Sequence, residues 1–164
     1  MEVSRNLEPL AELISGDRRL TIRLMGFWQA TRVGAERCAR ADDFLATLPD
    51  ELMGDCCMAV LSDGGVWELR DIGDDIARVS GITGPSAKLS DLPPGSVLAE
   101  AVRDLDDAFN FISPILHEGD TRDENGCRAV FRSILLPLSD NQGRVMQVLA
   151  AARCGAVPRL RALS

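Results

Sequence analysis

The chain carries the sequence GCRAVFRSILLPLSDNQGRVMQVLAAAR at residues 126–153. Two apolar runs flank a short polar turn, Asp140-Asn141-Gln142-Gly143. A glycine at the end of such a turn adopts a positive φ at little cost, and this chemistry favours a β-hairpin. The first run closes with Leu136-Pro137-Leu138, and the second begins at Val145. We therefore expect two antiparallel strands here, with the rest of a sheet arranged around them.

Three more strands are expected before this hairpin. An apolar run at 56–61 is followed by the turn Ser62-Asp63-Gly64-Gly65 and by an alternating run at 66–72. The apolar run 111–116 predicts another strand, with a charged loop after it at 118–125. If sequential neighbours pair and the first strand also meets the last, the five strands form one antiparallel sheet.

The remaining segments predict helices. The expected ranges are 7–14, 18–33 capped by Asp17, 43–52, 73–81 ended by Gly81, and 96–109 capped by Ser96. Several strand runs are apolar at every position, which indicates that both faces of the sheet are covered. We therefore expect an α+β fold with helices on one face and an N-terminal helical cap on the other. The expected domain plan is a cap or dimerisation segment at 1–42, the sheet domain at 43–155 and a tail at 156–164.

One apolar stripe on the second helix has two compatible interpretations. Leu20, Leu24, Phe27 and Trp28 recur at helical spacing. The stripe packs on its own domain, or it forms the interface of a homodimer.

Composition excludes several classes of function. The chain has 164 residues, 46% of them hydrophobic, and a net charge of −7, which disfavours a nucleic-acid partner. It contains no apolar run of about 18 residues that could span a membrane, and no secretory signal follows Met1. A cytoplasmic protein is therefore expected.

The cysteines and the single histidine disfavour a metal site. The five cysteines include no Cys-x-x-Cys pair and are expected to be reduced.

No nucleophile elbow, phosphate loop or paired-carboxylate motif is present, so the chain is not expected to be an enzyme.

Five pieces of the chain occur in a characteristic order: Trp28 with Arg32, Leu48-Pro49, Gly64-Gly65-Val66-Trp67, Asp71-Ile72-Gly73 and the hairpin from Leu135 to Gly143. With these pieces the layout resembles a PAS sensory domain, and more narrowly a divergent PAS-like family common in alphaproteobacteria. The resemblance implies a PAS fold and a sensory or regulatory role, without naming a ligand.

Three candidate sites each have a competing structural interpretation. His117 is either a haem ligand, as in some PAS domains, or an ordinary residue at the end of a strand. Asn125-Gly126-Cys127-Arg128 is similar to the motif of light-sensing flavin domains, but it precedes a strand near the end of the chain. Cys56-Cys57 is a core pair or a redox sensor. The cofactor is left unknown.

A ligand cavity is expected between the sheet and the helices on its inner face. The expected apolar wall is Trp67, Ile76, Val79, Leu105, Phe109 and Ile115. The expected ligand-binding set is Trp67, Arg70, Phe109, His117, Arg128 and Arg132. The alternative is a filled core without a ligand.

The sequence thus predicts a sensory or regulatory module. Its output is expected to pass through a separate signalling protein, with the module itself a homodimer. The alternative is a small-molecule receptor.

Overall fold

The computed structural model describes residues 19–32, 34, 36–122 and 125–156. The expected helix at 7–14, the Asp17 cap and most of the expected tail at 156–164 lie outside these residues.

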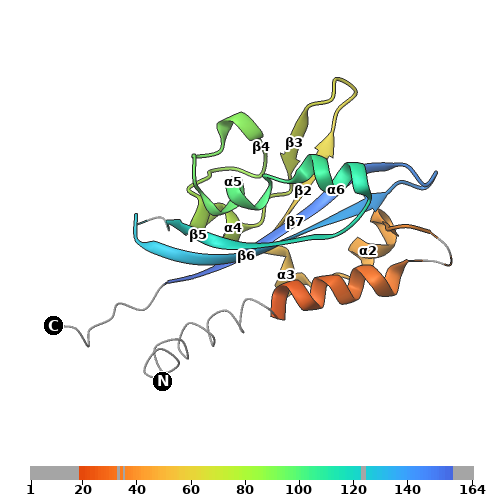
Figure 1. Ribbon diagram of the computed structural model, residues 1–164, viewed down its shortest axis with the longest axis horizontal. Helices are drawn as coiled ribbons and strands as arrows, with labels where there is room; N and C mark the ends of the chain where they lie inside the picture. Colours follow the sequence, from red (N-terminus) through yellow and green to blue (C-terminus); the bar gives the residue numbers. More distant parts are fainter. Residues whose placement is uncertain (1–18, 33, 35, 123–124, 157–164) are drawn as a thin grey trace.

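Short helices lie between groups of strands along the chain, and three consecutive strands close it (Figure 1). Residues 19–31 are helical. The elements that follow are β1 (Ala39–Arg40), α2 (Ala41–Thr47), α3 (Asp50–Met53), β2 (Cys56–Leu61), β3 (Trp67–Arg70), α4 (Asp74–Ser80), β4 (Ala87–Lys88), the 3₁₀ helix η1 (Leu89–Asp91), α5 (Val97–Ala101), α6 (Leu105–Phe111), β5 (Ile115–Arg122), β6 (Arg128–Ser139) and β7 (Val145–Ala156).

One sheet runs through the molecule in the order β1-β6-β7-β2-β3-β4, and β5 also pairs with β6. The first long strand, β2, lies antiparallel to the last, β7, as the sequence predicts. Four of the five strands lie close to where they were expected, the fifth is displaced along the chain, and two-residue strands, β1 and β4, are added at the edges. β1 is the exception to the antiparallel pattern, since it runs parallel to β6.

The closing hairpin forms as expected. Gly143 has a φ of 80°, and its N–H donates to the carbonyl of Asp140. The Asp140 carboxylate also accepts from the backbone N–H groups of Gln142 and Arg144, at 2.8 and 2.9 Å. The side chain of Asp140 therefore fixes the shape of the turn.

Two hydrophobic cores lie on opposite faces of the sheet. The first joins the strands to α4, α5 and α6, and the second joins them to the 19–31 helix, α2 and α3. Neighbours in β6 show the alternation directly, because Leu135 belongs to the first core and Leu136 to the second. The α+β fold with helices on one face and a helical cap on the other is confirmed.

The strand expected at 111–116 is displaced in the structure. Phe111 ends α6, and β5 occupies Ile115–Arg122, most of which was expected to be loop. Both acidic residues of this strand have a partner on β6: Glu118 pairs with Arg132, and Asp120 with Arg128. His117 therefore lies inside a strand and not at its end.

The helix expected at 96–109 is two helices. Ser96 caps α5 as predicted, and its hydroxyl accepts from the N–H of Ala99. α5 ends at Ala101 and α6 starts at Leu105. Both pieces bury side chains in the first core, so the apolar spacing continues across the break and does not reveal it.

Candidate functional site

The 19–31 helix is fastened to the sheet through Trp28. Its indole Nε1 donates a 2.8 Å hydrogen bond to the backbone carbonyl of Pro137 in β6, and the contact is buried. The guanidinium of Arg32 lies 5.3 Å from the centre of the Trp28 ring, within the range of a cation–π interaction. Two of the matching sequence motifs, the tryptophan and the closing hairpin, thus meet in space.

Pro137 occupies a particular position on β6. Along the outer edge of this strand, β5 pairs as far as Leu135, and β1 pairs from Leu138. The residues between have no strand beside them on that edge, among the residues described. A proline is tolerated there because it has no N–H to contribute to a ladder. The carbonyl of Pro137 is then satisfied by Trp28.

The stripe expected to form a dimer interface packs within the chain. Leu20, Leu24 and Trp28 are buried in the second core, and Phe27 is partly buried against it. An interface between two copies that used this stripe would require the helix to leave its own sheet. A dimer interface at these four residues stays a prediction.

The six expected wall residues converge in the first core. Ile76, Trp67 and Leu105 are buried there, and the side chains of Val79, Phe109 and Ile115 pack against them. Trp67 Nε1 donates to the Asp106 carboxylate at 2.8 Å, and its ring meets Phe109 edge-on at 5.9 Å. These contacts hold α6 against the sheet.

The expected ligand-binding set is divided between the two faces of the sheet. Trp67, Phe109 and His117 lie on the face of the first core, whereas strand alternation places Arg70, Arg128 and Arg132 on the opposite face. Each arginine is also ion-paired, to Glu68, Asp120 and Glu118 respectively. The six residues therefore do not surround one common space.

His117 contacts groups on its own face. Its Nε2 lies 3.3 Å from Nη2 of Arg103, and its ring is 5.5 Å from that of Phe131. A ring nitrogen of a neutral imidazole can accept a hydrogen bond, so this distance fits a bond that Nη2 of Arg103 donates to Nε2 of His117.

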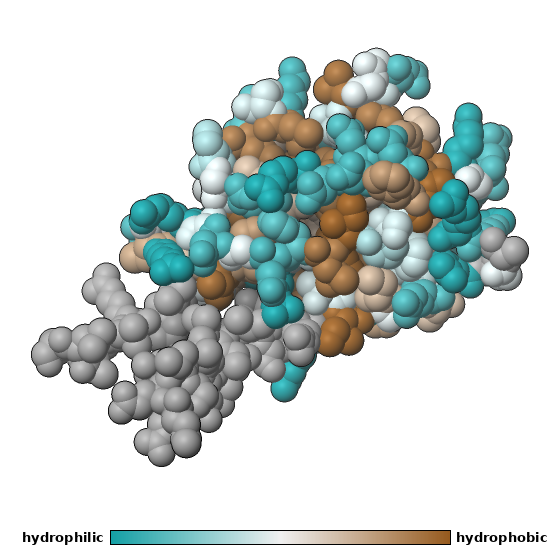
Figure 2. Space-filling model, viewed as in Figure 1, coloured by the Kyte–Doolittle hydropathy of each residue, from teal (hydrophilic) through white to brown (hydrophobic). Residues whose placement is uncertain are grey.

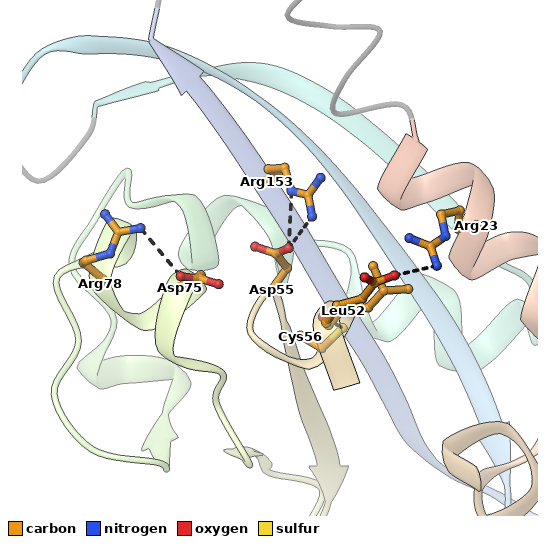
Figure 3. Close-up of polar contacts among 8 residues, drawn as sticks. Arg23, Leu52, Asp55, Cys56, Asp75, Arg78 and Arg153 are labelled. Atoms are coloured by element: carbon orange, nitrogen blue, oxygen red, sulfur yellow. Dashed lines mark hydrogen bonds and ion pairs between the residues drawn. The ribbon is translucent and has the colours of Figure 1, made fainter. Parts of the chain in front are cut away.

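A row of charges crosses the second face at the margin of its core. Arg132 of β6 pairs with Glu118 of β5 at 2.8 Å, and its cross-strand neighbour is Arg153 of β7. Figure 3 shows Arg153 reaching the carboxylate of Asp55, just before β2, with two hydrogen bonds of 2.7 and 3.3 Å. Three strands and the residue before β2 thus contribute to one line of charges, in which two neighbouring arginines are flanked by two carboxylates.

A cavity of about 300 Å³ lies beside this row. It is lined by Thr21, Leu116, His117, Glu118, Arg132 and Ser133. Thr21 comes from the 19–31 helix and the others from β5 and β6. Sequence reasoning singled out Arg132 and His117 but missed Thr21, Leu116 and Glu118, because their proximity depends on the β5–β6 register.

The cysteine pair at the start of β2 is buried. Burial raises the pKa of Cys56 to about 12, with a smaller contribution from the Asp55 carboxylate, and burial likewise raises the pKa of Cys57. The Cys56 thiol donates to the carbonyl of Leu52 at 3.2 Å. The two side chains enter opposite cores, as core packing requires. Neither thiol has the low pKa of a reactive cysteine.

Two negative findings apply to the described residues only. Among them, no group of three or more histidine, cysteine or acidic side chains is arranged to hold a metal ion. In the same part of the chain, no helix has the length and apolar character to cross a membrane.

No protein-family model and no curated protein matches the sequence. Solved structures do match. The PAS domain of the fruit-fly ELK potassium channel superposes with a TM-score of 0.50 and 12% identity, covering 71% of this chain and 98% of that domain. The PAS domain of Bordetella pertussis BvgS gives a TM-score of 0.40 and 13% identity, over 74% of this chain and 89% of that one. A Colwellia psychrerythraea PAS domain gives 0.44 and 12%, over 65% and 90%.

At these identities the likeness concerns the fold. The strand order β3-β2-β7-β6-β5, with helices between β3 and β5, is the one expected from the pairing of sequential neighbours and of the first strand with the last. The chain folds as a PAS-like domain.

Proposed function

We propose that this chain is a bacterial sensory or regulatory module that acts by binding proteins: a second copy of itself and a separate signalling protein. It is not proposed to be an enzyme. The PAS-like fold supports the sensory role, and the surface supports protein binding. The cytoplasmic location expected from the sequence stays a prediction.

The observation that carries this proposal is a set of exposed hydrophobic side chains. Ile22 on the 19–31 helix, Phe111 on α6 and Leu116 on β5 are each between 58% and 67% exposed. Figure 2 shows hydrophobic residues, interspersed with hydrophilic ones, on the face that presents these three elements. Large apolar side chains left exposed are candidates for a protein-binding surface. Because the inner stripe of the helix is occupied, this outer surface is the better candidate for the homodimer interface.

Native mass spectrometry of the purified chain tests the homodimer. We expect a dimer in the wild type and a monomer in Phe111→Glu and Leu116→Glu, because a buried carboxylate without a partner opposes association. Val66→Glu is the matched control: Val66 is 61% exposed in the β2–β3 turn, on a different element, and the variant should remain dimeric. A monomeric wild type, or dimers in both interface variants, would contradict the proposed surface.

The alternative is a small-molecule receptor with a ligand among Trp67, Phe109 and their neighbours in the first core. The same mass spectra distinguish it, since a bound ligand adds mass that is lost on denaturation.

A further inference from the structure

We propose that the cavity beside Thr21 binds a small organic carboxylate and that Arg132 is the residue that recognises it. This site lies on the face opposite the cavity expected from the sequence. The inference goes beyond the proposed protein-binding function and does not depend on it.

Arg132 is an incompletely satisfied cation. Its side chain is only 19% exposed, its Nη2 pairs with Glu118, and its Nε is buried with no hydrogen-bond partner. A buried donor without a partner is costly and calls for an acceptor. A planar carboxylate suits an arginine well, because it bonds two guanidinium N–H groups at once.

The neighbouring charges show why a ligand can engage Arg132 but not Arg153. Arg153 already donates two hydrogen bonds to Asp55, whose side chain is 11% exposed. Arg132 is held by Glu118, whose side chain is 64% exposed and is therefore only weakly constrained. A ligand carboxylate can displace Glu118 into solvent and take its place at the Arg132 guanidinium.

The size and walls of the cavity limit the rest of the ligand. A space of about 300 Å³ is at the lower end of small-molecule sites, so a short chain is favoured. Leu116, an exposed leucine, provides an apolar wall. A doubly charged phosphate fits less well, because Glu118 also lines the cavity and repels a second negative charge.

The occupant would touch both layers of the fold. Thr21 belongs to the 19–31 helix, and Leu116, Glu118 and Arg132 belong to the sheet. Ligand binding would therefore strengthen the attachment of the helix to the sheet.

The test is a ¹H–¹⁵N NMR titration of the full chain with butyrate, with butanol and inorganic phosphate as comparison ligands. Butyrate should cause saturable shifts centred on Thr21, Leu116 and Arg132, whereas butanol should not. Arg132→Gln should weaken butyrate binding about tenfold or more, since a charge-assisted bidentate contact is lost. Arg132→Lys should also bind more weakly, because it keeps the charge but loses the fork.

Glu118→Gln provides the sharpest variant because it should improve binding. Removing the competing carboxylate is expected to tighten butyrate binding by about two- to fivefold, the strength of an exposed ion pair. Arg128→Gln, an ion-paired arginine on the same face of β6, is the matched control and should bind as the wild type does.

Four results would overturn the proposal. These are no saturable butyrate shift, equal binding of butanol or phosphate, unchanged binding by Arg132→Gln, or weaker binding by Glu118→Gln. If Arg132→Gln fails to fold, Glu118→Gln still decides. The dimer mass of each variant is measured separately, so failure here leaves the protein-binding proposal standing, and the converse also holds.

Discussion

At the scale of single residues, Trp28 is the side chain that ties the helical cap to the sheet. It combines a buried ring with one hydrogen bond, from Nε1 to the carbonyl of Pro137. Phenylalanine keeps much of the ring and removes the donor. We expect Trp28→Phe to lower the free energy of unfolding by about 1–3 kcal/mol, because the Pro137 carbonyl is left buried without a partner. Urea denaturation followed by circular dichroism measures this.

Arg32→Gln is the control for Trp28, since it removes only the cation above the ring. Its expected cost is about 0.5–1 kcal/mol. Equal stability of Trp28→Phe and the wild type would mean that the hydrogen bond contributes nothing and that packing alone fastens the helix.

At the scale of elements, the β6–β7 turn depends on an ionised Asp140. Hydrogen bonds from the backbone N–H groups of Arg144 and Gln142, together with the Arg144 side chain, lower the pKa of Asp140 below its ordinary value of 3.8. A lowered folded-state pKa stabilises the fold above the unfolded-state pKa, and that stabilisation is lost as the pH falls through the folded-state pKa. Asp140→Asn should therefore be less stable than the wild type at neutral pH, and the difference should shrink in acid.

Chemical denaturation of both proteins between pH 7 and pH 2 measures this difference. Asp63→Asn, in the β2–β3 turn, serves as the control and should follow the wild type at every pH. A difference between Asp140→Asn and the wild type that stays constant down to the lowest pH would contradict the role of the ionised carboxylate.

The elements also show what the sequence could and could not predict. Local turn and capping chemistry predicts the hairpin and the Ser96 cap. Strands that are apolar at every position predict that both faces of the sheet are buried. β5 was misplaced because its charged half is stabilised by cross-strand pairs such as Glu118–Arg132, which no local pattern reveals. The cavity beside Thr21 could not be predicted for the same reason, because its position depends on which face of β5 meets the 19–31 helix.

At the scale of the whole molecule, the two cores share their strands and are expected to unfold together. Alternate side chains of β6 and β7 lie on opposite faces of the sheet, so neither core can unfold without disrupting the other. The chain has two tryptophans, and the structure places Trp28 in the second core and Trp67 in the first. Each core therefore contains its own fluorescent probe.

A mutation in one core should be detected by the probe in the other. In a Trp28→Phe background, Ile134→Val removes one methylene from the second core and should cost about 0.5–1.5 kcal/mol. We expect the free energy of unfolding obtained from Trp67 fluorescence in urea to fall by that full amount, with a lower urea midpoint. An unchanged Trp67 midpoint would show that the two cores unfold independently.

The short part of β6 around Pro137 that has no strand on its outer edge also affects the tendency of the protein to aggregate. An unpaired strand edge offers N–H and C=O groups to any extended chain that approaches it, and natural sheets block such edges. Pro137 has no N–H to offer, and Trp28 already occupies its carbonyl. A foreign strand therefore finds neither a donor nor a free acceptor at Pro137. The Trp28–Pro137 hydrogen bond, which attaches the helix to the sheet, thus also prevents a foreign strand from pairing with this part of β6.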